Sequence, residues 1–186
     1  MKLFIVALVA MMPAINLKSF GQGKYLDKSC DVSFYSHTPI EDIEAKNSSA
    51  LAVLDAQNGT VEFGVLIKAF QFEKALMQEH FNENYMESEK FPKATFKGQI
   101  KNMSDINLKA DGSYTADISG TMTIHGVSKE ITSKATIVVK GDNINAKSDF
   151  VVSPEDYDIE IPGVVKEKIA KEIKVNVNAD FAAYAN

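Results

Sequence analysis

The stretch GTMTIHGVSKEI, residues 120–131, decides the fold. Within it Met122 and Ile124 alternate with threonines, and the same period of two resumes after His125-Gly126. Alternation of apolar and polar residues is typical of a β-strand with one buried face. A two-residue loop between such strands needs residues that accept a positive φ, which glycine does freely and histidine tolerates. The stretch therefore predicts a tight antiparallel hairpin with His125-Gly126 in its turn.

Segments with the same period of two occupy most of the chain. Turn signals such as Asn58-Gly59, Asp111-Gly112 and Gly141-Asp142 separate many of them, which favours antiparallel neighbours. We expect an all-β fold, an eight-stranded antiparallel barrel, and a two-sheet β-sandwich is the alternative. The eight segments are residues 30–37, 47–57, 59–69, 94–102, 113–124, 128–140, 143–153 and 172–184.

Two segments depart from the strand pattern. Residues 70–87 place Phe72, Phe81 and other apolar side chains near one helical face, and Pro92 follows. This spacing predicts one short amphipathic helix. Residues 164–172 follow Pro162-Gly163 and are compatible with one or two further helical turns.

The first residues have the pattern of an export signal. Lys2 precedes an apolar run over residues 3–15, and small residues follow at a spacing typical of cleavage sites. Pro13 interrupts the run, which is shorter than the roughly 20 residues of a spanning helix. We therefore predict a secretory signal peptide over residues 1–21, a single domain over 22–186, and a periplasmic or secreted location. Cys30 is then the one cysteine of the mature domain, so no internal disulfide is expected.

Composition and motifs argue against several functions. The chain has 25 acidic and 20 basic residues, and the basic ones are scattered, so no nucleic-acid partner is expected. Motifs of hydrolases, nucleotide-binding loops and redox sites do not occur, so we expect no catalytic residues and no enzyme activity. A metal or enzyme site would require His37, His80 and His125 to converge. Their spacing in the sequence does not indicate such a site. Carboxylates within residues 155–160 could offer oxygen ligands to a cation, but we favour a solvated acidic loop.

The apolar faces of the strand segments mix large and small side chains. Ala116, Gly120 and Ala135 interrupt runs of large residues, and none of the inward positions is charged. An eight-stranded barrel can fill its interior with side chains or hold one small ligand. The frequent small residues favour an elongated apolar cavity. The alternative is a solid-core barrel or sandwich that serves a partner protein through its loops or its helix.

Residues 80–100 and 120–131 carry a recognisable set of positions, which are Phe91, Pro92, Phe96, Gly98, Gly120, Thr123, His125, Gly126, Val127 and Lys129. These positions give the sequence a resemblance to the YceI-like family of secreted polyisoprenoid-binding proteins. The resemblance implies a lipocalin-like barrel with a helix by the opening and a long isoprenoid or fatty-acyl chain held inside. In one departure, residues 153–163 carry acids where many relatives have an arginine-containing segment. An acidic rim would repel an anionic head group unless a lysine or a cation intervened.

The expected function is therefore the binding of a long-chain apolar small molecule for transport, storage or sequestration. The lipid or isoprenoid is the ligand, and neither a cofactor nor a metal is expected. Transient membrane contact for lipid exchange and a homodimer are both compatible with this function. The predicted wall is Phe34, Phe63, Val65, Phe96, Met122, Ile124, Phe150 and Phe181, and the predicted mouth is Phe72, Met77, Phe81 and Tyr157.

Overall fold

The computed structural model describes residues 23–184, so the predicted signal peptide lies outside the described residues. These residues form nine strands and one short α-helix, α1 (Ala75–His80). No helix within residues 23–184 is long and apolar enough to span a membrane. The strands are β1 (Lys24–His37), β2 (Asp42–Asp55), β3 (Thr60–Leu66), β4 (Gln71–Phe72), β5 (Lys93–Ile100), β6 (Gly112–Ile124), β7 (Val127–Lys140), β8 (Asn143–Val152) and β9 (Ile173–Ala183).

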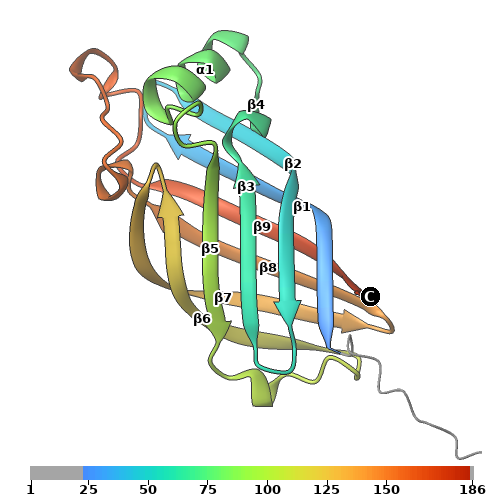
Figure 1. Cartoon of the computed structure of the whole chain (residues 1–186). Helices are drawn as coiled ribbons and strands as arrows, with labels where there is room; N and C mark the ends of the chain where they lie inside the picture. Colours follow the sequence, from blue (N-terminus) through green and yellow to red (C-terminus); the bar gives the residue numbers. More distant parts are fainter. Residues whose placement is uncertain (1–22, 185–186) are drawn as a thin grey trace, which may run out of the picture.

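Eight of these strands close into one antiparallel barrel (Figure 1). The neighbours run in the order β1-β9-β8-β7-β6-β5-β3-β2, and β1 pairs with β2 to close the circle. The two-residue strand β4 adds to β2 outside this circle. The predicted eight-stranded barrel is confirmed, and the sandwich alternative is wrong because one sheet closes on itself.

The hairpin predicted from residues 120–131 is present. Strands β6 and β7 pair along their whole length, ending with Ile124 opposite Val127. The two turn residues have positive φ, 52° at His125 and 79° at Gly126. These values match the two-residue hairpin turn whose twist suits antiparallel strands.

The helix is shorter than its sequence pattern. Residues 70–72 are extended, and the helix begins at Ala75 and passes into a π-helical turn, Phe81–Tyr85. The cause is tertiary packing, because the Phe72 ring lies 5.7 Å from that of Phe34 and 5.0 Å from that of Phe81. Pairing of β4 with β2 holds Phe72 in that position. Residues 164–172 contain only a 3-10 turn, Gly163–Val165.

The barrel interior differs between its two ends. At the end away from α1, buried alanines such as Ala116 and Ala135 pack with Ile137 and Phe181 in a filled core. The loop between β5 and β6 covers this end with Ile106. Larger side chains from other strands fill the space beside these small residues. The expectation that small inward residues line a void is therefore wrong for Ala116 and Ala135.

Candidate ligand-binding cavity

The half of the barrel nearer α1 is hollow. Its cavity has a volume of about 570 Å³. Alternation along each strand directs every second side chain inward, and here those side chains are mostly large and apolar. The barrel wall of the cavity includes Val32, Phe34, Phe63, Val65, Ala94, Phe96, Ile118, Met122, Ile124, Ile131, Phe150, Val152, Val175 and Val177.

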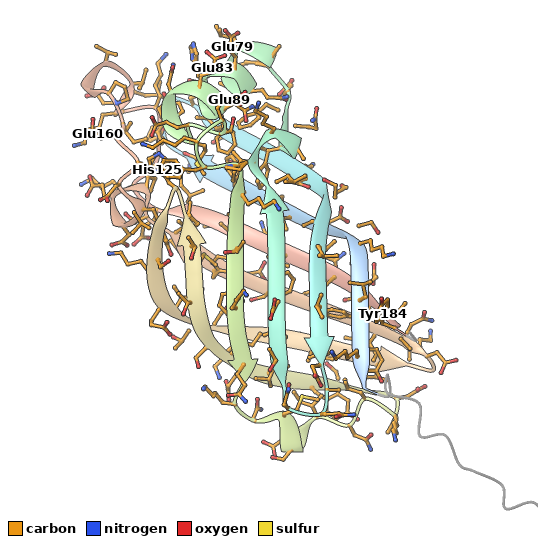
Figure 2. The ribbon with its side chains drawn as sticks, in the orientation of Figure 1. Glu79, Glu83, Glu89, His125, Glu160 and Tyr184 are labelled. Carbon is orange, nitrogen blue, oxygen red and sulfur yellow. The ribbon has the colours of Figure 1, made fainter. Side chains whose placement is uncertain are left out.

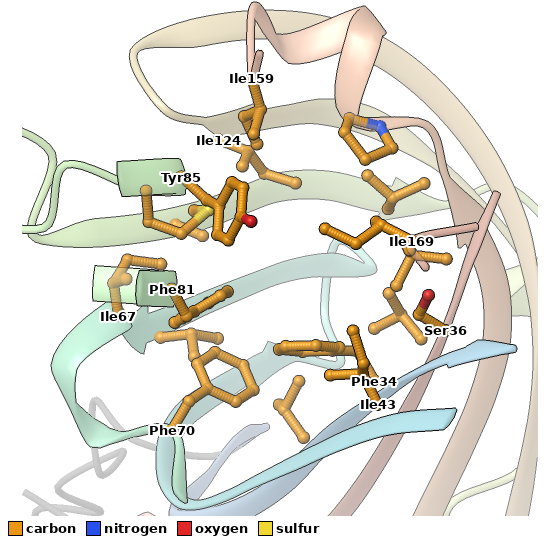
Figure 3. A pocket seen from close by; sticks show the side chains of 18 of the residues that line it. Phe34, Ser36, Ile43, Ile67, Phe70, Phe81, Tyr85, Ile124, Ile159 and Ile169 are labelled. Atoms are coloured by element: carbon orange, nitrogen blue, oxygen red, sulfur yellow. The ribbon is translucent and has the colours of Figure 1, made fainter. Parts of the chain in front are cut away.

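Two chain segments cover this end of the barrel (Figure 1). The first comprises β4, α1 and the following π-helical turn, and the second is the stretch between β8 and β9. Tyr85 and Phe81 of the first segment face Ile169 of the second across the cavity (Figure 3). Exposed side chains within the lining, such as Leu76 at 60% exposure, mark a mouth to solvent. Since the opposite end is filled, the cavity has its opening on the α1 side.

The cavity brings together all but two of the predicted site residues. Phe34, Phe63, Val65, Phe72, Met77, Phe81, Phe96, Met122, Ile124 and Phe150 line it. Phe181 belongs instead to the filled core at the other end. Tyr157 is buried in the cluster that includes Met122 and Ile159, but unlike those two residues it does not line the cavity. Contact of these side chains with a ligand stays a prediction.

Several residues that line the cavity were not predicted from the sequence. Tyr85 lies four positions after Phe81, and this spacing places both on one side of a helical turn, so the signal was present. Ile43 and Ile169 line the opposite wall, and no local pattern set them apart from other apolar residues.

Most polar groups in the cavity wall already have partners. The hydroxyls of Ser133 and Ser148 lie 2.9 Å apart, and Ser148 donates to the Lys134 carbonyl at 2.9 Å. The buried Ser36 hydroxyl accepts a hydrogen bond from the Ala170 N–H at 2.9 Å, which ties the second cover segment to β1. These groups rigidify the wall and leave it apolar toward the cavity.

The charged side chains at the mouth are mainly basic. Glu41 and Lys74 both reach the lining, and their charged atoms lie 3.3 Å apart. His80 and Lys168 also reach it, whereas the acids of residues 155–160 are exposed and do not. The lining from that loop is apolar and includes Ile159. The acidic segment therefore does not form the cavity rim, and lysines occupy the mouth.

The structure offers no metal centre in the part of the chain that it describes. Residues 23–184 contain no group of three or more histidine, cysteine, aspartate or glutamate side chains placed to hold a metal ion. His80 lies at the mouth, while His125 is engaged at the β6–β7 turn and His37 pairs with Asp42.

A closed antiparallel barrel with an apolar cavity opening at one end defines a lipocalin-like protein. The chain belongs to the YceI-like family, since residues 27–181 match its YceI-like domain.

Curated relatives include a UPF0312 protein of Pseudomonas putida, 26% identical over 98 residues. That match covers 50% of this chain and 47% of the relative, so the chain spans about half the length of the curated relatives it matches.

Solved structures share the fold at low sequence identity. A polyisoprenoid binding domain from Saccharophagus degradans, implicated in plant cell wall breakdown, has a TM-score of 0.75 and 13% identity, covering 87% of this chain and 99% of that one. BcnA of Burkholderia cenocepacia has a TM-score of 0.67 and 16% identity, covering 82% and 96%. A YceI protein of Campylobacter jejuni has a TM-score of 0.51 and 16% identity, covering all of both chains. These likenesses show the barrel fold.

Proposed function

We propose that this protein binds one long-chain apolar molecule, an isoprenoid or a fatty-acyl chain, and catalyses no reaction. The observation that carries the proposal is the cavity of about 570 Å³ with apolar walls and a mouth at the α1 end. The solid-core alternative does not account for this hollow half of the barrel. The polyisoprenoid binding domain with the same fold supports the choice of ligand class.

Burial of the chain supplies the affinity. Each methylene group removed from water contributes about 0.8 kcal/mol. A methylene group takes a volume similar to that of a water molecule, about 30 Å³, so the cavity holds roughly 15 to 20 carbon atoms. A longer polyisoprenoid would leave its remaining carbon atoms outside the mouth.

We further propose that the protein is exported by residues 1–21 and serves transport, storage or sequestration of its ligand. Transfer to or from a membrane would be aided by apolar side chains at the mouth end of the barrel. Ile40, Leu76 and Val164 are exposed by 57%, 60% and 90%, and their segments lie at that end (Figure 1). Exposed apolar side chains around an opening are suited to transient contact with a lipid surface.

The cavity can be tested by filling it. Ala94 lines the hollow half, so Ala94→Phe should fill part of the ligand space and weaken ligand binding while the barrel still folds. Ala135 lies in the filled half, so Ala135→Phe should overpack the core and destabilise the protein by about 1–3 kcal/mol.

Organic extraction measures the amount of lipid recovered from each purified protein. Native mass spectrometry of the intact complex measures how many lipid molecules each protein binds. We expect stoichiometric lipid with the unmodified protein, and less lipid or a shorter chain with folded Ala94→Phe. An unmodified protein that carries no lipid and takes up no apolar dye would refute the proposed function.

A further inference from the structure

The Tyr85 hydroxyl is a polar group of the cavity that has no partner among residues 23–184. The tyrosine lies at the end of the π-helical turn Phe81–Tyr85, and its ring packs against the cluster of Ile67 and Met122. Its hydroxyl points into the cavity (Figure 3) and makes no hydrogen bond to any residue within 23–184. The serine hydroxyls of the wall, in contrast, are paired.

A tyrosine hydroxyl in an apolar site usually has a hydrogen-bond partner, because an unpaired one loses its hydration without compensation. Burial raises the pKa of Tyr85, so the phenol keeps its proton and can act as a donor. The hydroxyl faces a cavity whose lining is mostly apolar, so a ligand that enters through the mouth can supply the partner.

The position of Tyr85 determines which part of a ligand it would meet. It belongs to the cover of the cavity, while the cavity floor is the filled core at the far end. A long-chain ligand enters with its hydrocarbon toward that core, which places its polar end near the cover. Lys168 also lies at the mouth, and its ammonium group has no ion-pair partner within residues 23–184.

We propose that the Tyr85 hydroxyl donates a hydrogen bond to an acceptor oxygen in the ligand's head group, just inside the mouth. This inference rests on the proposed function and narrows its ligand class. The ligand is a single-chain amphiphile with a carbonyl, ester or carboxylate oxygen at one end. The unpaired ammonium of Lys168 makes the same position favourable for a negatively charged head group.

The test compares two probes that differ in one oxygen atom. The probes are 2-tridecanone, which carries a carbonyl oxygen near its end, and 1-tridecene, which has the same chain length without it. Their dissociation constants are measured by displacement of a fluorescent apolar dye from the delipidated protein. The variant is Tyr85→Phe, which removes only the hydroxyl.

We expect Tyr85→Phe to weaken binding of the ketone by about three- to tenfold, the range of one neutral hydrogen bond, and to leave the alkene within about twofold. The matched control is Tyr114→Phe, because the Tyr114 hydroxyl bonds to the Ala110 carbonyl outside the cavity. That control should change neither probe. In the absence of ligand, Tyr85→Phe should melt no lower than the unmodified protein, since it removes a group without a partner.

The outcomes separate the inference from the proposed function. If the unmodified protein binds both probes and Tyr85→Phe binds the ketone equally well, the inference is overturned and the proposed function stands. Binding of the alkene alone also overturns the inference. If the unmodified protein binds neither probe, the proposed function fails with it.

Discussion

His125 connects the two segments that cover the cavity. Its Nε2 atom lies 3.0 Å from Oε2 of Glu87, which follows the π-helical turn, and its Nδ1 atom lies 3.2 Å from the Tyr157 carbonyl in the second cover segment. The Phe91 ring packs edge-on against the imidazole at a centroid distance of 4.4 Å. Figure 2 shows His125 at the covered end of the barrel. The turn of the β6–β7 hairpin thus contacts the second cover segment and the residue range that follows the first.

Removal of the hydrogen bond between His125 and Glu87 should loosen the cover without opening the barrel. Asparagine tolerates the positive φ of the turn, so His125→Asn tests the side chain rather than the turn. We expect His125→Asn and Glu87→Ala each to lower the free energy of unfolding by about 1 kcal/mol, measured by urea denaturation. Because both remove the same hydrogen bond, the double variant should lose less than the sum of the two.

The exposed pair of His37 and Asp42 gives a control for this experiment. Its atoms lie 2.5 Å apart, but both side chains are more than half exposed, whereas that of His125 is 11% exposed. Solvent screens an exposed pair, so His37→Asn should cost less than His125→Asn. Equal losses at the two sites, or additive losses in the double variant, would contradict a connecting role for His125.

Gly120 should tolerate no side chain. It pairs with Gly98 across β6 and β5, and a Cβ atom on Gly120 would lie 2.3 Å from both the Gly98 Cα and the Lys97 carbonyl oxygen. Gly120→Ala should therefore lower the free energy of unfolding by about 3 kcal/mol. Gly64 in β3 is the matched control, because a Cβ atom there meets nothing within 4 Å. Gly64→Ala should change stability by less than about 0.5 kcal/mol, and similar losses for both variants would refute this reading.

Cys30 should react slowly with thiol reagents in the folded protein. Its side chain is fully buried, and burial together with the charges of Asp27, Asp31 and Asp180 raises its pKa to about 12. The thiolate is the reactive form, so at pH 8 the folded protein should react about a thousandfold more slowly than the urea-unfolded chain. The measurement is the rate of colour release from an aromatic disulfide reagent. Equal rates in both states would show that Cys30 is accessible.

The same pKa shift predicts how stability changes at alkaline pH. The unfolded thiol loses its proton near pH 9, while the folded thiol keeps it to about pH 12. The folded state then binds more protons than the unfolded state, so the contribution of Cys30 is fully present below pH 9 and declines between about 9 and 12. Urea denaturation of the unmodified protein and Cys30→Ala across this range isolates the effect. A constant difference between the two proteins would contradict it.

The barrel and its hairpin could be predicted because they depend on local patterns. Alternation of apolar residues indicates which side chains point inward. The positive φ required at His125-Gly126 indicates where two strands turn. The inward placement of Phe63, Phe96 and Met122 followed from the same alternation.

The height of a residue along the barrel axis could not be predicted in this way. Phe181 and Phe150 both occupy inward positions of neighbouring strands, yet Phe181 packs in the filled half and Phe150 lines the cavity. Their height depends on strand register, which pairs Phe181 with Ile144 and Phe150 with Val175. Period-two patterns are the same at every height, so they carry no information about which half is hollow.

The amino-acid sequence by itself determined the class of fold, the turn at His125-Gly126 and an apolar barrel interior, because each depends on residues close together in the chain. Tertiary structure alone decided that one half is filled and that Tyr85 faces the hollow half without a partner. It also moved the start of the helix to Ala75, since contacts of Phe72 with Phe34 and Phe81 outweighed local helix preference. Those outcomes depend on side chains brought together from distant strands, and the free energy of that packing exceeds any local propensity.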